Sequence, residues 1–256
     1  MAPRTAEDRT TGELIASISG RVPTRNLHSL VLWQLGVAIV AGDFAEGSIL
    51  PSDAELLRRF NVSRTVLREA LKTLAAKGMI EARARIGTKV LPRGRWNLFD
   101  ADVLAWHFET GPDASFLQAL SEIRIGVEVE SAALAALRRN GEQARALHEC
   151  VAAMAASASP EQFARADLQF HRTVAEASNN PFMASISALV EVALTAMFTI
   201  SSPVENSGDL QGTVEAHARI ARAIEDKKPD EARDAMKAVI SEGFQRAASR
   251  MGQKDI

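Results

Sequence analysis

Three side chains in the second half of the chain could act together chemically: Asp167, His171 and His217. Asp167 and His171 are four residues apart, so on a helix both side chains would face the same point. His217 lies in another predicted helix, from which it could reach the same point. Two imidazoles and one carboxylate are also the donor set of non-haem iron enzymes, so a metal-dependent enzyme is one hypothesis. Those sites usually lie on strands, whereas these residues lie in segments with helical periodicity. A metal-free polar pocket and a plain Asp–His pair on one helix are the alternatives.

A second candidate is Arg124, whose guanidinium matches the geometry of a carboxylate and could clamp an acidic ligand. Glu128 follows four residues later, so an ion pair within one helix is the alternative interpretation. The rest of the chain has no nucleophile–base pattern and no glycine loop of the kind that cradles phosphate. The chemistry that these residues predict is therefore the binding of a cation or a small acid.

The composition is that of an ordinary globular protein, with 46% apolar and 24% charged residues in a chain of 256. A single cysteine, Cys150, cannot form an internal disulfide, which fits a reducing compartment. The longest strongly apolar stretch, about residues 30–41, is shorter than the roughly 20 residues that a membrane span needs. The N-terminal residues lack the apolar core of a secretory signal. We therefore expect a cytoplasmic location and no contact with a membrane.

The charge of the chain is distributed unevenly. The net charge is −2, but residues 51–95 contain eleven Lys and Arg against four Asp and Glu. Residues 96–256 contain 15 basic and 23 acidic side chains. A basic module joined to a larger acidic one favours a part that binds a polyanion and a separate part for sensing or assembly.

Turn residues and periodicity predict the elements of the basic module. Residues 26–40 have the apolar spacing of a helix with one buried stripe, and Ser52 and Ser63 are N-cap candidates for two more helices. Residues 79–84 and 88–91 predict a hairpin that turns around Gly87. Together these elements make a winged helix-turn-helix, which we place at residues 25–92 after a mobile segment at 1–24.

The rest of the chain predicts helices alone. We interpret residues 93–99 as a linker and residues 100–250 as one domain, because this stretch is rich in Ala, Leu and Glu and has no strand-like alternation. Its expected helices lie near residues 101–109, 114–139, 142–157, 160–178, 181–201, 212–226 and 230–250. The expected fold class is mainly α, a winged helix-turn-helix followed by an all-α bundle.

The basic module resembles a known family. Residues 47–57, GSILPSDAELL, and 63–71, SRTVLREAL, are similar to the DNA-binding domain of GntR-family transcription regulators. The resemblance implies double-stranded operator DNA as the partner, with the helix after Ser63 in the major groove. Arg64 and Arg68 share one helix face and can bond guanine bidentately, whereas Ser63 at the helix N-terminus suits phosphate.

The same resemblance fixes the other DNA-binding candidates. Gly87 would let the backbone of the wing approach the minor groove closely. Family members often carry an Arg two residues after the first-helix Ser, and Ala54 stands there in this chain. Arg58 and Arg59 could partly replace that contact. The residues expected to bind DNA are Ser52, Arg58, Ser63, Arg64, Thr65, Arg68 and Gly87.

Residues 100–250 resemble the effector domain of the FadR subfamily, in which many members hold a divalent metal beneath the effector. The resemblance implies a zinc, nickel or manganese type of ion on Asp167, His171 and His217. The family's fourth ligand, a histidine, is replaced by Val239, so open coordination positions remain for oxygens of an effector. The resemblance also places Arg124 and Asn180 at the effector.

Residues 95–106, RWNLFDADVLAW, are similar to the linker of sugar-acid regulators. The expected function is a homodimeric transcription regulator, a repressor of a sugar-acid or related carboxylate catabolic operon. A small carboxylate such as an aldonate would release it from its operator. The alternatives are the non-haem enzyme and an architectural DNA-binding dimer without an effector, which leaves the Asp–His–His group without a role.

Overall fold

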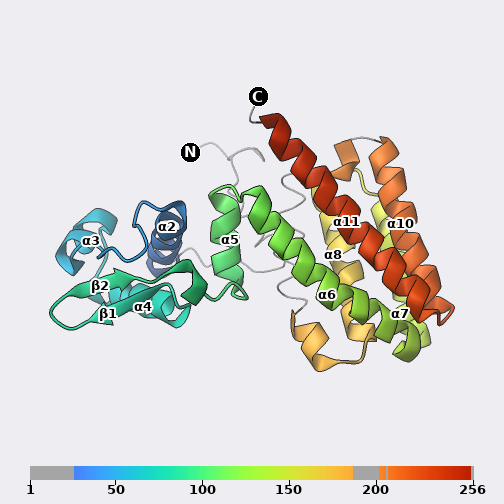
Figure 1. The fold of residues 1–256 in the computed structure, drawn as a ribbon, viewed down its shortest axis with the longest axis horizontal. Coiled ribbons are helices and arrows are strands. Elements are labelled where there is room, and N and C mark those ends of the chain that lie inside the picture. The colour runs from blue at the N-terminus through green and yellow to red at the C-terminus, as the bar shows by residue number, and fades with distance from the viewer. Residues whose placement is uncertain (1–25, 187–201, 206, 255–256) are drawn as a thin grey trace. The chain divides into compact units, whose positions relative to one another are not determined.

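The computed structural model describes residues 26–186, 202–205 and 207–254. The chain divides between Pro112 and Asp113 into two compact units, of which the second is entirely helical in its described parts (Figure 1). The expected mainly α fold class is confirmed. The predicted mobile segment at 1–24 and most of the helix expected at 181–201 lie outside the described residues. Among the helices that are described, none combines the length and apolarity needed to cross a bilayer.

The first unit holds the predicted helix-turn-helix and wing. Its first five elements are α2 (Leu27–Ala41), α3 (Asp53–Phe60), α4 (Arg64–Ala76), β1 (Ile80–Arg83) and β2 (Gly87–Val90). Ser52 caps α3 by accepting a hydrogen bond from the backbone N–H of Glu55, as the sequence predicts. Asn61 turns the chain between α3 and α4 with a φ of +50°, in the left-handed region that Asn tolerates.

The wing is a two-stranded antiparallel sheet. Ile80 lies opposite Val90, and Arg83 lies opposite Gly87. The tight turn needs positive φ at Arg85 (+65°) and at Gly87 (+114°), a conformation that glycine adopts without strain. The buried ends of both strands face the helices, where the side chains of Ile80 and Val90 join the core of the unit. The buried ends of the two strands therefore attach the exposed turn of the wing to the core of the unit.

The segment expected to be a linker is instead packed against the first unit. Residues 93–95 form a short 3-10 helix, and Trp96 is buried. The backbone N–H of Asn97 donates to the carbonyl of Lys77 at 2.9 Å. The ammonium of Lys77 lies 2.7 Å from both carboxylate oxygens of Asp100. These contacts fasten the chain after the wing to the C-terminal end of α4.

Helix α5 (Ala101–Glu109) packs on α2, and residues 101–112 lie in the first unit. The sequence analysis assigned these residues to the helical domain because the composition changes before them. The physical reason for the difference is a fit between the indole of Trp106 and the bare Cα of Gly36, which composition does not reveal. Trp33 packs edge-on against the same indole.

The second unit is a helical bundle. Its elements are α6 (Ala114–Arg138), α7 (Gly141–Ala155), α8 (Pro160–Ala177), the short η3 (Pro203–Glu205), α10 (Ser207–Glu225) and α11 (Pro229–Lys254). α6 packs against α11 and α8, and α10 packs against α11 and α7 (Figure 1). Large apolar side chains on α8 and α10, such as Phe170 and Ile220, meet small residues on α6, such as Ala132 and Ala136. The core therefore surrounds the inner faces of α8 and α10.

Two helices of this unit begin earlier than expected. α7 begins at Gly141 because Asn140 caps it in a full capping box with Gln143. α10 begins at Ser207 rather than near residue 212, and it contains Gly208 and Gly212. A glycine inside a helix costs about 1 kcal/mol relative to Ala, which a packed helix tolerates.

Candidate functional site

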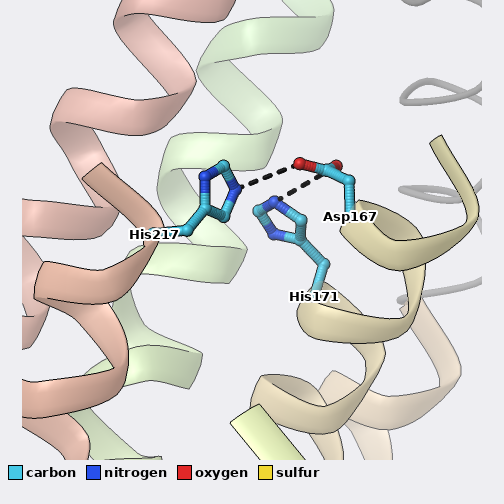
Figure 2. A group of neighbouring side chains, drawn as sticks. All are labelled: Asp167, His171 and His217. Atoms are coloured by element: carbon cyan, nitrogen blue, oxygen red, sulfur yellow. Dashed lines mark ion pairs between the residues drawn. The ribbon is translucent and has the colours of Figure 1, made fainter. Parts of the chain in front are cut away.

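The three candidate metal ligands meet inside the bundle. Asp167 and His171 project from successive turns of α8, and His217 projects toward them from α10 (Figure 2). The Nε2 atom of His217 lies 3.1 Å from Oδ1 of Asp167, and Nε2 of His171 lies 3.7 Å from Oδ2. One ligand atom from each residue lies within 4.8 Å of the others. The structure thus brings together the residues that the sequence grouped.

Each histidine turns its other ring nitrogen to an acceptor outside the group. Nδ1 of His217 lies 2.8 Å from the carbonyl oxygen of Thr213, one turn earlier on α10. Nδ1 of His171 lies 2.5 Å from Oε2 of Glu128 on α6. A neutral imidazole carries one proton, so these acceptors favour the proton on Nδ1 and a free lone pair on Nε2.

The group has the features of a cation site. It is deeply buried, with side-chain exposures of 1–3%. Among the described residues, Asp167 Oδ2, His217 Nε2 and both ring nitrogens of His171 are buried atoms without a well-aligned hydrogen bond, so Nδ1 of His171 meets Glu128 as a close ion-pair contact. Buried polar atoms without partners are costly, and two lone pairs that face a carboxylate repel it unless a proton or a cation lies between them. Imidazole and carboxylate donors together suit zinc, nickel and manganese.

The acids of this region remain ionised. Burial alone would raise the pKa of Asp167, but the neighbouring His171, His217 and Arg124 lower it below the ordinary value. Burial also acts to raise the pKa of Glu128, and the opposing effect of Arg124 and His171 brings it down to about 2. Both side chains are therefore carboxylates at neutral pH, the form in which they can bind a cation.

Arg124 is buried and engaged by Glu128. Its Nε donates to Oε1 of Glu128 at 2.6 Å, and a second guanidinium nitrogen lies 3.4 Å from Oε2. The intrahelical ion pair, the alternative in the sequence analysis, is therefore present. Arg124 nevertheless stays close to the histidines, because its partner Glu128 also contacts His171.

A small pocket lies beside His171 and Glu128. It is lined on α6 by Val127 and Ser131 and on α8 by Val174, with Met236 from α11. One side of this pocket is polar and the remainder is mainly apolar. The pocket measures about 10 Å³, which is room for about one water molecule, so an effector would need the surrounding side chains to move.

Two other candidates have structural roles. The side chain of Asn180 accepts a hydrogen bond from the backbone N–H of Phe182 and begins the helical segment at residues 181–186. No described contact joins Asn180 to the Asp–His–His group. Val239 on α11 belongs to the same apolar core cluster as Phe170, whose ring contacts both histidines edge-on.

Sequence reasoning missed two contributors, Thr213 and the second role of Glu128. Thr213 acts through its backbone carbonyl, which carries no side-chain signal. Glu128 was visible as the partner of Arg124 at four-residue spacing. Its contact with His171 depends on the packing of α6 against α8, which a sequence pattern does not specify.

The DNA-binding candidates lie on the exposed side of the first unit. Ser63 caps α4 by accepting from the N–H of Val66 at 3.3 Å, and Arg64, Thr65 and Arg68 of α4 are exposed. Arg58 is also exposed on α3, whereas the guanidinium of Arg59 lies over the rings of Phe44 and Phe60. Arg59 is thus partly committed to packing, whereas Nε of Arg58 lies 3.4 Å from the carbonyl oxygen of Ala54 within α3.

Comparisons with known proteins follow the division into two units. The model of bacterial regulatory proteins of the gntR family matches residues 31–90, and the FCD domain model matches residues 119–242. The chain is 33% identical over 219 residues to the uncharacterized HTH-type transcriptional regulator YieP of Escherichia coli, which covers 84% of this chain and 93% of that protein.

Other relatives extend over similar lengths. Identity to the galactonate operon transcriptional repressor of Escherichia coli is 31% over 224 residues, 87% of this chain and 97% of that one. Identity to the NanR repressor of Klebsiella aerogenes is 32%, over 87% of this chain and 86% of that protein. A solved structure of Lar, which controls the expression of the Listeria monocytogenes agr system, superposes with a TM-score of 0.63. It has 19% identity and covers 88% of this chain and 98% of that one, so it supports the fold alone.

Proposed function

The chain belongs to the GntR family of bacterial regulatory proteins and carries an FCD domain, and from this premise we propose that it represses a sugar-acid catabolic operon. It is a DNA-binding transcription regulator and not an enzyme, since its relatives are transcriptional regulators. Two of those relatives are named as repressors, one of them of a galactonate operon. The effector that we propose is a small carboxylate of the aldonate type.

The observation that carries the proposal is the buried Asp167–His171–His217 group beside Arg124, inside the FCD domain of a chain that also has a winged helix. An architectural DNA-binding protein would have no use for such a group. We propose that Asp167, His171 and His217 hold a divalent metal. When bound, the metal would supply open coordination positions for carboxylate and hydroxyl oxygens, since Val239 replaces the expected fourth ligand.

Arg124 supplies the second anchor of the proposed site. A guanidinium has five N–H donors, and Glu128 engages only part of them. The remaining donors can bind an effector carboxylate. Asn180 stays a weaker proposal, because its side chain already caps a helical segment.

On the DNA side, we propose that Arg64 and Arg68 read bases, and that Ser52, Arg58, Ser63 and Thr65 hold the phosphate backbone, with Gly87 at the minor groove. The protein would bind as a homodimer to two half-sites of fixed spacing. An effector that binds one state of the bundle better than another shifts the population toward that state. A coupling of about 1–3 kcal/mol would lower operator affinity by roughly 5- to 150-fold.

The test is a titration of operator DNA with a panel of aldonates, uronates and simple carboxylates. The operator is selected from a random DNA library with the purified protein, and the melting temperature of the protein is recorded with each acid. We expect at least one aldonate to weaken DNA binding and to raise the melting temperature. If simple monocarboxylates release the DNA and aldonates do not, the sugar-acid assignment is wrong. If no acid acts on either readout, the effector proposal fails.

A further inference from the structure

Glu128 lies between the two anchors of the proposed effector site. One of its oxygens accepts from Nε of Arg124 at 2.6 Å, and the other lies 2.5 Å from Nδ1 of His171. All three side chains are at most 8% exposed. A single carboxylate therefore bridges an arginine on its own helix, α6, and a histidine on the neighbouring helix, α8.

We propose that Glu128 is the positioning residue that couples the Arg124 anchor to the metal centre. It holds the proton of His171 on Nδ1, so that Nε2 is presented to the ion, and the same side chain orients the guanidinium of Arg124. The inference rests on the proposed metal and effector site and assigns a role to a residue outside its ligands. Carboxylates that orient ligating histidines in this way typically change metal affinity by 10- to 100-fold.

His217 provides an internal comparison. Its Nδ1 is held by the carbonyl oxygen of Thr213, a backbone atom fixed within α10. The acceptor of His171, by contrast, is the side chain of Glu128, which Arg124 also holds. Of the two histidines, only His171 can therefore respond to a change at Arg124.

The shared carboxylate makes the two anchors interdependent. An anion bound to the remaining donors of Arg124 weakens the attraction between the guanidinium and Glu128, and so alters the hold of Glu128 on His171. Because a coupling between two binding sites is reciprocal, a metal on His171 changes the affinity of Arg124 for an anion by the same factor. The structure in this way connects effector binding to the metal through one side chain on α6.

The experiment compares Glu128→Gln with Glu130→Gln. Glu130 lies two residues further along α6, is exposed and pairs with Arg233 at 2.9 Å, so it is a matched control for loss of a paired carboxylate. Zinc affinity is measured by titration of the full chain. The position of each imidazole proton is read from the ring ¹⁵N resonances of the metal-free protein.

For Glu128→Gln we expect a 10- to 100-fold loss of zinc affinity and a fall in the Nδ1–H population of His171. The resonances of His217 should not change, because Thr213 still holds its proton. Glu130→Gln should match the wild type in every readout. Glu128→Asp keeps the charge that Arg124 requires and shortens the side chain, so it tests the same role if the Gln variant does not fold.

Two results overturn the proposal. One is an equal zinc affinity of the wild type and a folded Glu128 variant, and the other is an unchanged proton position on His171. If the wild type itself binds no zinc, nickel or manganese, the metal part of the proposed function fails. The metal-free ¹⁵N measurement then still decides whether Glu128 holds His171, so the two failures are distinguishable.

Discussion

The indole of Trp106 covers the Cα of Gly36 so closely that a Cβ on residue 36 would lie 2.4 Å from the ring. This contact joins α5 to α2 in the core of the first unit. Real Cβ atoms do not approach a ring so closely, so any side chain at residue 36 must displace the indole or the helix that carries it.

Gly36→Ala should therefore destabilise the first unit by about 1–3 kcal/mol, the usual cost of overpacking a core. The measurement is urea unfolding followed by tryptophan fluorescence, which reports the first unit, and by circular dichroism, which reports the helices of both units. Gly126→Ala is the control, because a Cβ there meets nothing within 4 Å. In that variant the helix propensity of Ala should leave stability unchanged or raise it by up to about 1 kcal/mol. An equal free energy of unfolding for Gly36→Ala and the wild type would show that the close contact between Gly36 and Trp106 is absent.

Replacing Arg64 or Arg68 by Ala should weaken operator binding by about 1–3 kcal/mol and relax base preference at one position of each half-site. The side chains are exposed at the start of α4, where a major-groove contact does not compete with packing. Footprinting and salt titration of the selected operator provide the measurement. Arg222→Ala, on the exposed face of α10 in a pair with Glu215, is the control and should bind DNA normally. Unchanged operator preference in both α4 variants would exclude this helix as the element that recognises the bases.

His217→Ala should abolish binding of about one divalent ion per chain, because it removes one of the three proposed ligands and leaves Asp167 and His171. Elemental analysis after loading with zinc, nickel or manganese measures the ion content. His148→Ala is the control, since His148 is half-exposed and pairs with Glu225 at the surface. Val239→His should tighten metal binding by supplying the missing imidazole. A wild-type protein without metal after loading would contradict the prediction.

Arg124→Ala should give a repressor that still binds DNA but no longer responds to the effector. The substitution also leaves Glu128 buried without its guanidinium partner, which typically costs about 3–5 kcal/mol, so the melting temperature should fall as well. Arg233→Ala removes a partly exposed arginine that pairs with Glu130 and Asp230, and it should keep the response. If Arg124→Ala is released from the operator by the same acids as the wild type, the carboxylate anchor is another residue.

The thiol of Cys150 should react slowly with disulfide reagents at pH 8. Burial, reinforced by the charge of Glu149, raises its pKa to about 11, so the reactive thiolate is scarce. Since the folded-state pKa lies above the unfolded value, the unfolded chain loses this proton first, and stability falls as the pH rises above 9. Reaction with Ellman's reagent before and after addition of urea measures the effect, and equal rates would contradict it.

The predicted helices depended on local signals, and these were accurate where a cap was visible. Ser52 and Ser63 each accept the hydrogen bond expected of an N-cap. Asn140 lies between the helices predicted near residues 114–139 and 142–157, and in the structure it is the cap of the second. Local patterns therefore located the elements well but left their first residues uncertain by up to five positions, as at α10.

The Asp167–His171–His217 group could be predicted, but its surroundings could not. The four-residue spacing of Asp167 and His171 places both on one helix face, and the family resemblance adds His217. The contact of Glu128 with His171 and the packing of Trp106 on Gly36 are long-range fits between helices. Such fits depend on how the helices approach one another, and no spacing within one segment encodes that approach.

The contacts of Lys77 with Asp100 and Asn97 determine where the chain can be divided into fragments that fold. A fragment that ends at residue 92 would lack Trp96, the acidic partner of Lys77 and the indole that fills the space beside Gly36. Its exposed apolar surface would favour aggregation. Dissection of the DNA-binding half should therefore cut after Pro112, where the first compact unit ends.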